Sequence, residues 1–266
     1  MLRRSLIGLT LSSALWAQEV APPASLSKEE IATAVADEKI SLPMPGELFA
    51  ALGKQGRIDW SAMLRKMPSG TFTSRQQIAL NLGTLVADGY LAVEAQDKQQ
   101  VKNIAKDIRA LAKALSVDEG LVARGSSIVQ FAEAGQWETL REELEATQNE
   151  VVASMIAHKD RALVTLVMLG GWLRGTEVVS TYIAGHYDAE SAKVLRQPAV
   201  VDHFVQELAN MPKKITDTPL VDAVRLKLFE IKKAVTFGSQ ITPTDEDVKR
   251  LSELATSVVK TISTKE

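Results

Sequence analysis

The chain has 266 residues, of which 45% are apolar and 24% charged; this composition is typical of a globular protein and excludes a disordered chain or a multi-span membrane protein. Its 31 basic and 33 acidic residues give a formal net charge of −2, which argues against a nucleic-acid-binding protein because such proteins usually carry a basic excess. The absence of cysteine excludes disulfides, thiolate metal sites and a cysteine nucleophile, and three histidines are too few for a histidine-rich metal site.

Residues 1–17 are predicted to be a secretory signal peptide. Two arginines near the start are followed by an apolar run that ends at Leu15, and then by small residues up to Ala17. The run is shorter than the roughly 20 residues that cross a bilayer, so we expect no membrane span in the mature chain. The small residues predict cleavage after Ala17, or alternatively after Ala14. This order predicts export to a periplasm, with secretion as the alternative; a buried N-terminal helix is the competing interpretation. Cleavage removes two basic residues and no acid, which changes the formal net charge from −2 to −4.

Residues 18–26 contain two adjacent prolines and are predicted to form an extended spacer. Ser27-Lys-Glu-Glu30 has the form of a capping box and predicts a first helix of roughly ten residues. Proline and glycine interrupt the chain after it, so we expect short helical pieces at 46–53 and 59–67. Residues 27–70 are therefore predicted to be a peripheral part of the protein with irregular helices.

Two segments, at about 75–97 and 161–184, carry apolar side chains on nearly every face, which is typical of buried helices. The second contains the uncharged run 163–173, which is too short for a membrane span but short enough for a buried strand. A helix is favoured because the helical periodicity continues through Val178 and Ile183. We therefore predict two central apolar helices.

The rest of the chain is also helical in pattern. Ser116-Val-Asp-Glu119 resembles a second capping box and predicts a helix that ends near Ala134, before Gly135. Apolar residues at alternating spacings of three and four, and prolines near helix starts, indicate the other helices. These predicted helices lie at about Val101–Leu115, Trp137–Met155, 188–196, 198–210, 219–236 and 244–262.

Alternation of apolar and polar residues with a period of two is almost absent. The sequence therefore predicts an all-α protein, a multi-helix bundle of about nine or ten helices. No linker or block of charge divides residues 27–262, which we treat as a single domain. Within it, 74–184 is predicted to form the core, and 188–262 is a candidate for a semi-separate helical subdomain.

Polar residues inside the two central helices form the candidate site. Asn81, Thr84 and Asp88 share one face of the first helix, and Arg174 and Glu177 share a face of the second. An unpaired buried charge costs several kcal/mol, so a buried Asp88 needs a partner. Arg174 is the predicted partner because both helices are expected to be central.

Three glycines lie in the same two helices, at positions 83, 170 and 171, and each costs about 1 kcal/mol of helix propensity relative to alanine. A close approach of the two helix backbones would offset that cost. The polar residues of the two central helices have two interpretations. They form an internal ion pair that fixes how the helices dock, which we favour, or they form the polar floor of a ligand pocket. The candidate binding residues are Asn81, Asp88, Tyr90, Trp172, Arg174 and Glu177.

Standard catalytic and cofactor motifs are missing from the sequence, so we predict no catalytic residue, no cofactor and no metal site. His186 and Asp188 follow Gly185 and are expected to cap helix ends. The alternative for this pair is a metal site completed by Asp202 or His203.

These observations favour an exported, non-enzymatic helical protein that acts as a binding or scaffold module. The sequence does not identify the partner, which is either a protein or a small ligand, and it points to no nucleic acid. The alternative function is a periplasmic small-molecule-binding bundle with a pocket near Asp88 and Arg174. An enzyme that uses Asp88 or Glu177 as acid or base has the least support, because no other catalytic group accompanies them.

Overall fold

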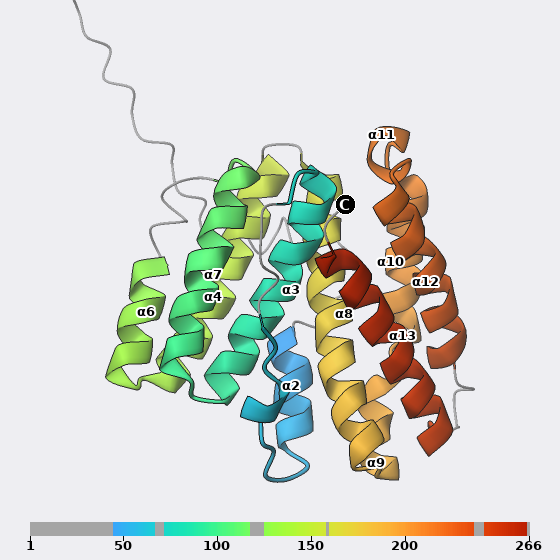
Figure 1. The fold of residues 1–266 in the computed structure, drawn as a ribbon, viewed down its shortest axis with the longest axis horizontal. Helices are drawn as coiled ribbons and strands as arrows, with labels where there is room; N and C mark the ends of the chain where they lie inside the picture. The colour runs from blue at the N-terminus through green and yellow to red at the C-terminus, as the bar shows by residue number, and fades with distance from the viewer. Residues whose placement is uncertain (1–44, 67–71, 118–124, 158–159, 237–241, 265–266) are drawn as a thin grey trace, which may run out of the picture.

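Helices are the main elements of the described structure, and irregular segments connect them. The computed structural model describes residues 45–66, 72–117, 125–157, 160–236 and 242–264, and within these ranges it contains no strand (Figure 1). The all-α fold class predicted from the sequence is therefore confirmed. The predicted signal peptide, the spacer and the first capping box lie outside the described residues.

Helices α3 (Arg75–Glu94) and α8 (Arg161–Gly185) form the centre of the bundle, as predicted (Figure 1). Ser74 begins α3, because its side chain accepts a hydrogen bond from the backbone N–H of Gln77 at 3.2 Å. The uncharged run 163–173 lies within α8, so the buried-strand alternative is wrong. By length and composition alone α8 could cross a membrane, but 83% of its most apolar window is buried by the rest of the protein.

Glycines let the backbones of α3 and α8 touch where the two helices cross. A Cβ atom on Gly83 would lie 1.9 Å from the carbonyl oxygen of Val167, and one on Gly170 would lie 2.1 Å from that of Leu80. Side-chain carbons do not come so close to a backbone oxygen, so only glycine fits at both positions. The predicted close approach is confirmed, and it sets the register of α3 against α8.

On one side of the central pair (Figure 1), α4 (Lys98–Ala114) and α7 (Trp137–Ala157) pack against it, and α6 (Gly125–Ala134) packs on these two helices. Asp97 begins α4, where its carboxylate accepts hydrogen bonds from two backbone N–H groups of the first turn. On α7, Leu140 and Met155 are buried, and Leu144 and Val151 are partly buried. The helix predicted at about Trp137–Met155 is therefore confirmed, and these side chains form its inward face.

Ser116 ends α4 and does not begin the next helix. Its φ of 63° is left-handed, its N–H bonds to the carbonyl of Lys113 at 3.0 Å, and the N–H of Val117 bonds to that of Ala112 at 3.1 Å. These two bonds form a Schellman motif, which closes a helix C-terminus, whereas an N-cap residue has an extended backbone. The prediction that Ser116 is the N-cap of a helix is therefore wrong; Asp118 and Glu119 lie outside the described residues, and α6, the next described helix, ends at Ala134 as predicted.

The other side of the central pair is covered by the C-terminal elements (Figure 1). They are α9 (Ala189–Ala192), the 3₁₀ helix η2 (Lys193–Leu195), α10 (Pro198–Asn210), α11 (Lys213–Thr216), α12 (Pro219–Val235) and α13 (Asp245–Ser263). Helix α13 packs along α8, α12 packs on α13, and α10 packs on α12. Thr244 and Asp247 form a capping box that begins α13. Apart from the short α11, these elements follow the predicted helix positions.

The helix α2 (Pro45–Gly53) precedes the central pair in sequence and packs on both of its helices. It agrees with the helical piece predicted at 46–53. Its Phe49 and Leu52 are fully buried and contribute to the apolar core. At least this part of the N-terminal segment is therefore a component of the core.

Residues 58–66 form a segment that we call the strap. Its only regular element is the 3₁₀ turn η1 (Ser61–Met63), which Asp59 stabilises by accepting a hydrogen bond from the Ser61 hydroxyl at 2.6 Å. The helix predicted over 59–67 is therefore wrong for the described residues. The backbone becomes extended at Leu64, directly after the turn, and Met63 and Leu64 pack against the apolar core.

Buried apolar side chains from α2 through α13 form one continuous cluster, and a smaller cluster lies among α3, α4, α6 and α7. The segment 188–262 therefore shares its apolar core with 74–184, chiefly where α13 packs on α8. Whether 188–262 is a semi-separate subdomain stays a prediction.

Candidate functional site

Asp88 and Arg174 lie opposite each other, about one turn beyond the glycine crossing of α3 and α8. The Nε atom of Arg174 donates a hydrogen bond to Oδ1 of Asp88 at 2.7 Å. Their side chains are only 6% and 2% exposed. This ion pair confirms the contact predicted from the sequence. It can form because the crossing holds the two helices close together.

Two more charged side chains complete a group that we call the charged network: Arg65, Asp88, Arg174 and Glu177. Arg65, from the strap, donates from Nε to Oδ2 of Asp88 at 2.9 Å. Arg174 donates from Nη1 to Glu177, one turn along α8, at 2.8 Å. Its Nη2 donates to the backbone carbonyl of Met63 in η1 at 3.0 Å. The network therefore ties the strap to both central helices.

The charges of this network balance, with two positive and two negative groups. Burial by itself lowers the pKa of Arg174, but the negative charges of Asp88 and Glu177 outweigh that effect and raise it. Every guanidinium nitrogen of Arg174 donates a hydrogen bond, and both carboxylate oxygens of Asp88 accept one. Asp88 and Arg174 thus make these hydrogen bonds with other groups of the same chain.

Gln77 and Asn81, one turn apart on α3, bind the C-terminal end of α13. Both side-chain amides donate to the carbonyl oxygen of Ile262, at 3.3 and 2.8 Å, and Gln77 also donates to that of Thr264 at 2.6 Å. Carbonyl groups in the last turn of a helix lack partners within the helix. The polar face of α3 supplies the missing donors, so Asn81 has a structural role here.

The charged network reaches the same end of α13. Nη1 of Arg65 donates to the hydroxyl of Ser263 at 3.2 Å. Thr84 lies between Asn81 and Asp88 on α3. Its hydroxyl donates to the carbonyl of Asn81 at 2.9 Å, which is a bond within the same helix. The polar face of α3 therefore joins α8, the strap and α13 in one arrangement, as expected for an internal ion pair that fixes helix docking.

Tyr90 faces α2 and not the charged network. Its ring lies against Gly46, where an added Cβ atom would be 2.9 Å from the ring carbons. Among the described residues its buried hydroxyl has no hydrogen-bond partner. Burial, together with the negative charges of Glu145 and Glu47, raises the pKa of Tyr90 above its ordinary value.

Trp172 faces α10. Its indole N–H donates to the side-chain oxygen of Gln197 at 2.7 Å, and its ring lies beside that of Phe204 with centroids 5.7 Å apart. Three of the six candidate residues therefore meet in the charged network, and the other three contact different parts of the bundle.

Arg65 and Gln77 are functional neighbours of the site that were not predicted from the sequence. Gln77 lies four residues before Asn81, so it continues the polar face of α3, and helical spacing alone could have found it. Arg65 lies in an extended segment without periodicity, 23 positions before Asp88, and no pattern in the sequence signals that the two would meet.

His186 and Asp188 are helix-end residues, as expected. His186 Nδ1 lies 3.1 Å from the carbonyl oxygen of Tyr182 in the last turn of α8. Asp188 begins α9, where its carboxylate accepts a hydrogen bond from the backbone N–H of Ser191 at 2.8 Å. Hydrogen bonding to Ser191 lowers the pKa of Asp188. In the part of the chain that the structure describes, no three histidine or acidic side chains are grouped so that they could hold a metal ion.

Comparison with known proteins adds no family to this picture. No protein-family model, no curated protein and no solved structure matches the chain. The interpretation of the site therefore depends on its geometry.

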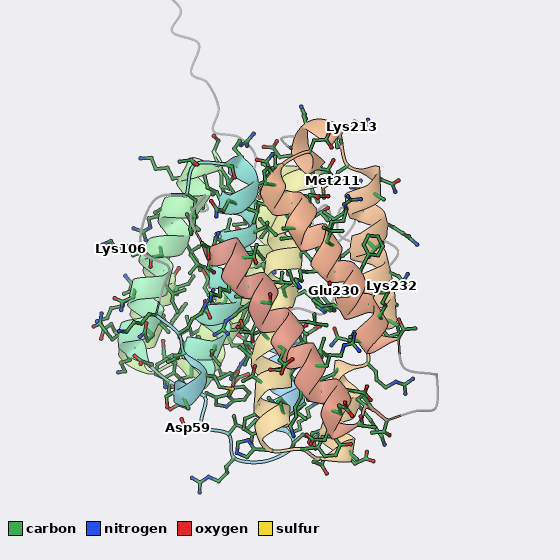
Figure 2. The ribbon with its side chains drawn as sticks, turned by 45° about the vertical axis from the view of Figure 1, so that its right-hand side comes forward. Asp59, Lys106, Met211, Lys213, Glu230 and Lys232 are labelled. Atoms are coloured by element: carbon green, nitrogen blue, oxygen red, sulfur yellow. The ribbon has the colours of Figure 1, made fainter. Side chains whose placement is uncertain are left out.

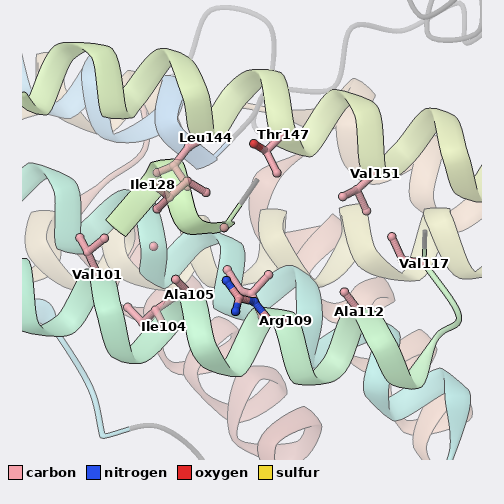
Figure 3. A pocket seen from close by; sticks show the side chains of 13 residues that line it. Val101, Ile104, Ala105, Arg109, Ala112, Val117, Ile128, Leu144, Thr147 and Val151 are labelled. Atoms are coloured by element: carbon pink, nitrogen blue, oxygen red, sulfur yellow. The ribbon is translucent and has the colours of Figure 1, made fainter. Parts of the chain in front are cut away.

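A small apolar cavity lies among α4, α6 and α7 (Figure 3). Its volume is about 60 Å³, whereas pockets for drug-sized ligands have roughly 300–1,000 Å³. Arg109 and Thr147 bring polar groups to its lining, but no member of the charged network lines it. Its apolar walls include Val101, Ile104, Ile128, Leu144 and Val151. This cavity is too small for the ligand pocket considered from the sequence, and it lies at another position.

Proposed function

We propose that the protein is an exported, non-enzymatic helical module that binds a partner, or holds a scaffold together, through its surface. The observation that supports this proposal is the closure of the charged network. Asp88 and Arg174 are almost completely buried and are bonded to each other and to neighbouring groups of the chain. A catalytic acid or base must be able to reach a substrate, and these groups are directed inward. The outer surface of the bundle is then the part available for function.

The order of basic, apolar and small residues over 1–17 supports the exported location. We expect the mature chain to begin at Gln18, or at Leu15 if cleavage follows Ala14. N-terminal sequencing of the protein recovered from the exported fraction checks this expectation. A mature chain that begins at Met1 would contradict it.

A small-molecule pocket beside the charged network is the second candidate function. It is favoured by the partial exposure of Glu177 and Arg65, whose side chains are 13% and 21% exposed and form the outer rim of the network. A ligand at this rim would have to replace hydrogen bonds between charged groups, and breaking a largely buried pair is costly. The pocket is therefore less well supported than the surface module.

Native mass spectrometry of the protein purified from the exported fraction of its own cells separates the two candidates. A protein partner bound at fixed stoichiometry supports the module, whereas an added mass in the small-molecule range supports the pocket. Glu177→Gln is a matched variant, because it keeps the size of the side chain and removes its charge at the rim. The module retains its protein partner in this variant; a small-molecule adduct that is lost in Glu177→Gln overturns the module in favour of the pocket.

A further inference from the structure

The outer face of α12 carries two large apolar side chains that the bundle leaves uncovered. Leu226 is 56% exposed and Phe229 is 42% exposed, and they lie three residues apart on one side of the helix. Helix α12 lies at the edge of the bundle beside α10 (Figure 1), and Glu230 and Lys232 mark it in Figure 2. Apolar side chains that stay exposed together are typical of an interaction surface.

An acidic residue precedes this apolar pair on the same face of α12, and a basic residue follows it. Asp222 lies four residues before Leu226, and Lys233 lies four residues after Phe229; all four residues are exposed. We call them the α12 stripe. Their spacings of four, three and four residues place them on a single face, with the repeat found along the contact of two paired helices. The stripe thus has an apolar centre, an acidic end and a basic end.

The stripe is complementary to itself when a second copy lies against it in the opposite direction. Around a two-fold axis midway between Leu226 and Phe229, each Leu226 meets the other copy's Phe229. In the same arrangement each Asp222 meets the other copy's Lys233. A two-fold interface requires this kind of reciprocal match. Parallel pairing in register would instead bring equal charges together at both ends, which is unfavourable.

We propose that α12 is a self-association surface, on which two copies of this chain pair their α12 helices antiparallel to form a two-fold dimer. The proposal depends on the α12 stripe alone and not on the function proposed above. The apolar centre excludes water and the charges form a polar rim, which is the usual arrangement of a protein interface. One pair of helices buries a limited area, so the dimer is a weak one that forms as the protein concentration rises.

The charged ends of the stripe are free to take new partners. Asp222 forms an ion pair with Arg225 on its own helix, but both side chains are about half exposed, at 51% and 46%. Exposed pairs of this kind contribute little to stability. Asp222 can therefore turn to a lysine of a second copy with little loss of free energy in the monomer.

Sedimentation velocity of the purified protein, over concentrations from about 1 to 300 µM at low salt, tests the proposal. We expect the average mass of the wild-type protein to rise toward that of a dimer. Asp222→Lys and Lys233→Asp should each weaken the dimer about tenfold or more, because each variant places equal charges together twice. An equimolar mixture of the two variants should restore the dimer, since one copy then carries lysine at both ends of the stripe and the other carries aspartate.

Lys249→Asp on α13 is the matched control, because Lys249 is an exposed lysine like Lys233 but lies on another helix, where it pairs with Asp245. It should leave association unchanged, and circular dichroism should show every variant to be folded. Leu226→Glu combined with Phe229→Glu should abolish the dimer. A wild-type protein that stays monomeric throughout the series, a mixture no heavier than the single variants, or a dimer that the Leu226 and Phe229 changes leave intact would each overturn the proposal.

Discussion

The crossing of α3 and α8 and the outer face of α12 combine similar residues, but they differ in where the charged groups find partners. At the crossing, Asp88 and Arg174 are buried and their charges are matched within the chain. On α12, Asp222 and Lys233 are exposed and, in our proposal, are matched by a second copy. An unpaired charge costs several kcal/mol inside a protein and almost nothing at its surface. The inner pair should therefore decide whether the chain folds, and the outer charges whether two copies associate.

The largest effect is expected from breaking the inner pair. Asp88→Asn and Arg174→Met should each lower the free energy of unfolding by roughly 3–5 kcal/mol, because each removes the most deeply buried ion pair of the network and unbalances its charges. The double variant should lose clearly less than the sum of the two single variants. Urea unfolding of the four proteins measures this cycle, and Glu177→Gln at the rim should cost less than either single variant. Additive losses of under about 0.5 kcal/mol each would show that the pair behaves as a surface pair.

A smaller effect is expected from separating the backbones that bring the pair together. Gly83→Ala should destabilise the protein by about 1–3 kcal/mol, because the added Cβ meets a backbone oxygen that cannot rotate away. Gly89 is the matched control on the same helix, since a Cβ there would lie 3.6 Å from Ile104, at ordinary contact distance. Gly89→Ala should stabilise by about 0.5–1 kcal/mol through helix propensity. The same sign for both variants in urea unfolding would argue against the close crossing.

Tyr90→Phe should change stability by less than about 1 kcal/mol at neutral pH, because the buried hydroxyl has no partner among the described residues. The effect should appear at alkaline pH. Because the pKa of Tyr90 is raised in the fold, the folded protein keeps a proton that the unfolded chain loses above about pH 10, so stability falls as the pH rises beyond that value. Tyr90→Phe should reduce this fall. An alkaline profile of Tyr90→Phe equal to that of the wild-type protein, measured by urea unfolding, would contradict the buried position.

The smallest effect on stability is expected on the outer face of α12. Leu226→Ala and Phe229→Ala remove exposed side chains, so each should change the free energy of unfolding by no more than about 0.5 kcal/mol. The same variants should weaken the proposed dimer in sedimentation. A large loss of stability at low protein concentration would show that this face is covered within the monomer.

The part of the site that could be predicted from the sequence is the part that breaks the pattern of its own helix. Asp88 and Arg174 are charges in otherwise apolar helices, and Gly83 and Gly170 are poor helix formers in helix interiors, so each required a compensating contact. The structure contains those contacts. Local spacing also placed α3 and α8 and most of the later helices.

What local spacing could not supply is which neighbour a side chain faces. Tyr90 and Trp172 lie on the predicted helices but face α2 and α10. Arg65 reaches Asp88 from an extended segment, where no periodicity applies. Ser116 has the sequence of a helix start, yet it closes α4, because its backbone takes the left-handed conformation, which the spacing of residues in the sequence does not reveal.

The hydrogen bonds from Gln77 and Asn81 to Ile262 connect positions 185 and 181 residues apart. At roughly 5–20 residues per second, a ribosome needs about 10–40 s to travel between them. Helix α8, apolar on most sides, is complete at Gly185, so for roughly the last 4–16 s of that interval it lacks α13, which packs along it. Until α13 is made, the apolar surface of α8 that it covers stays exposed on the nascent chain, and transiently exposed surface of this kind promotes aggregation.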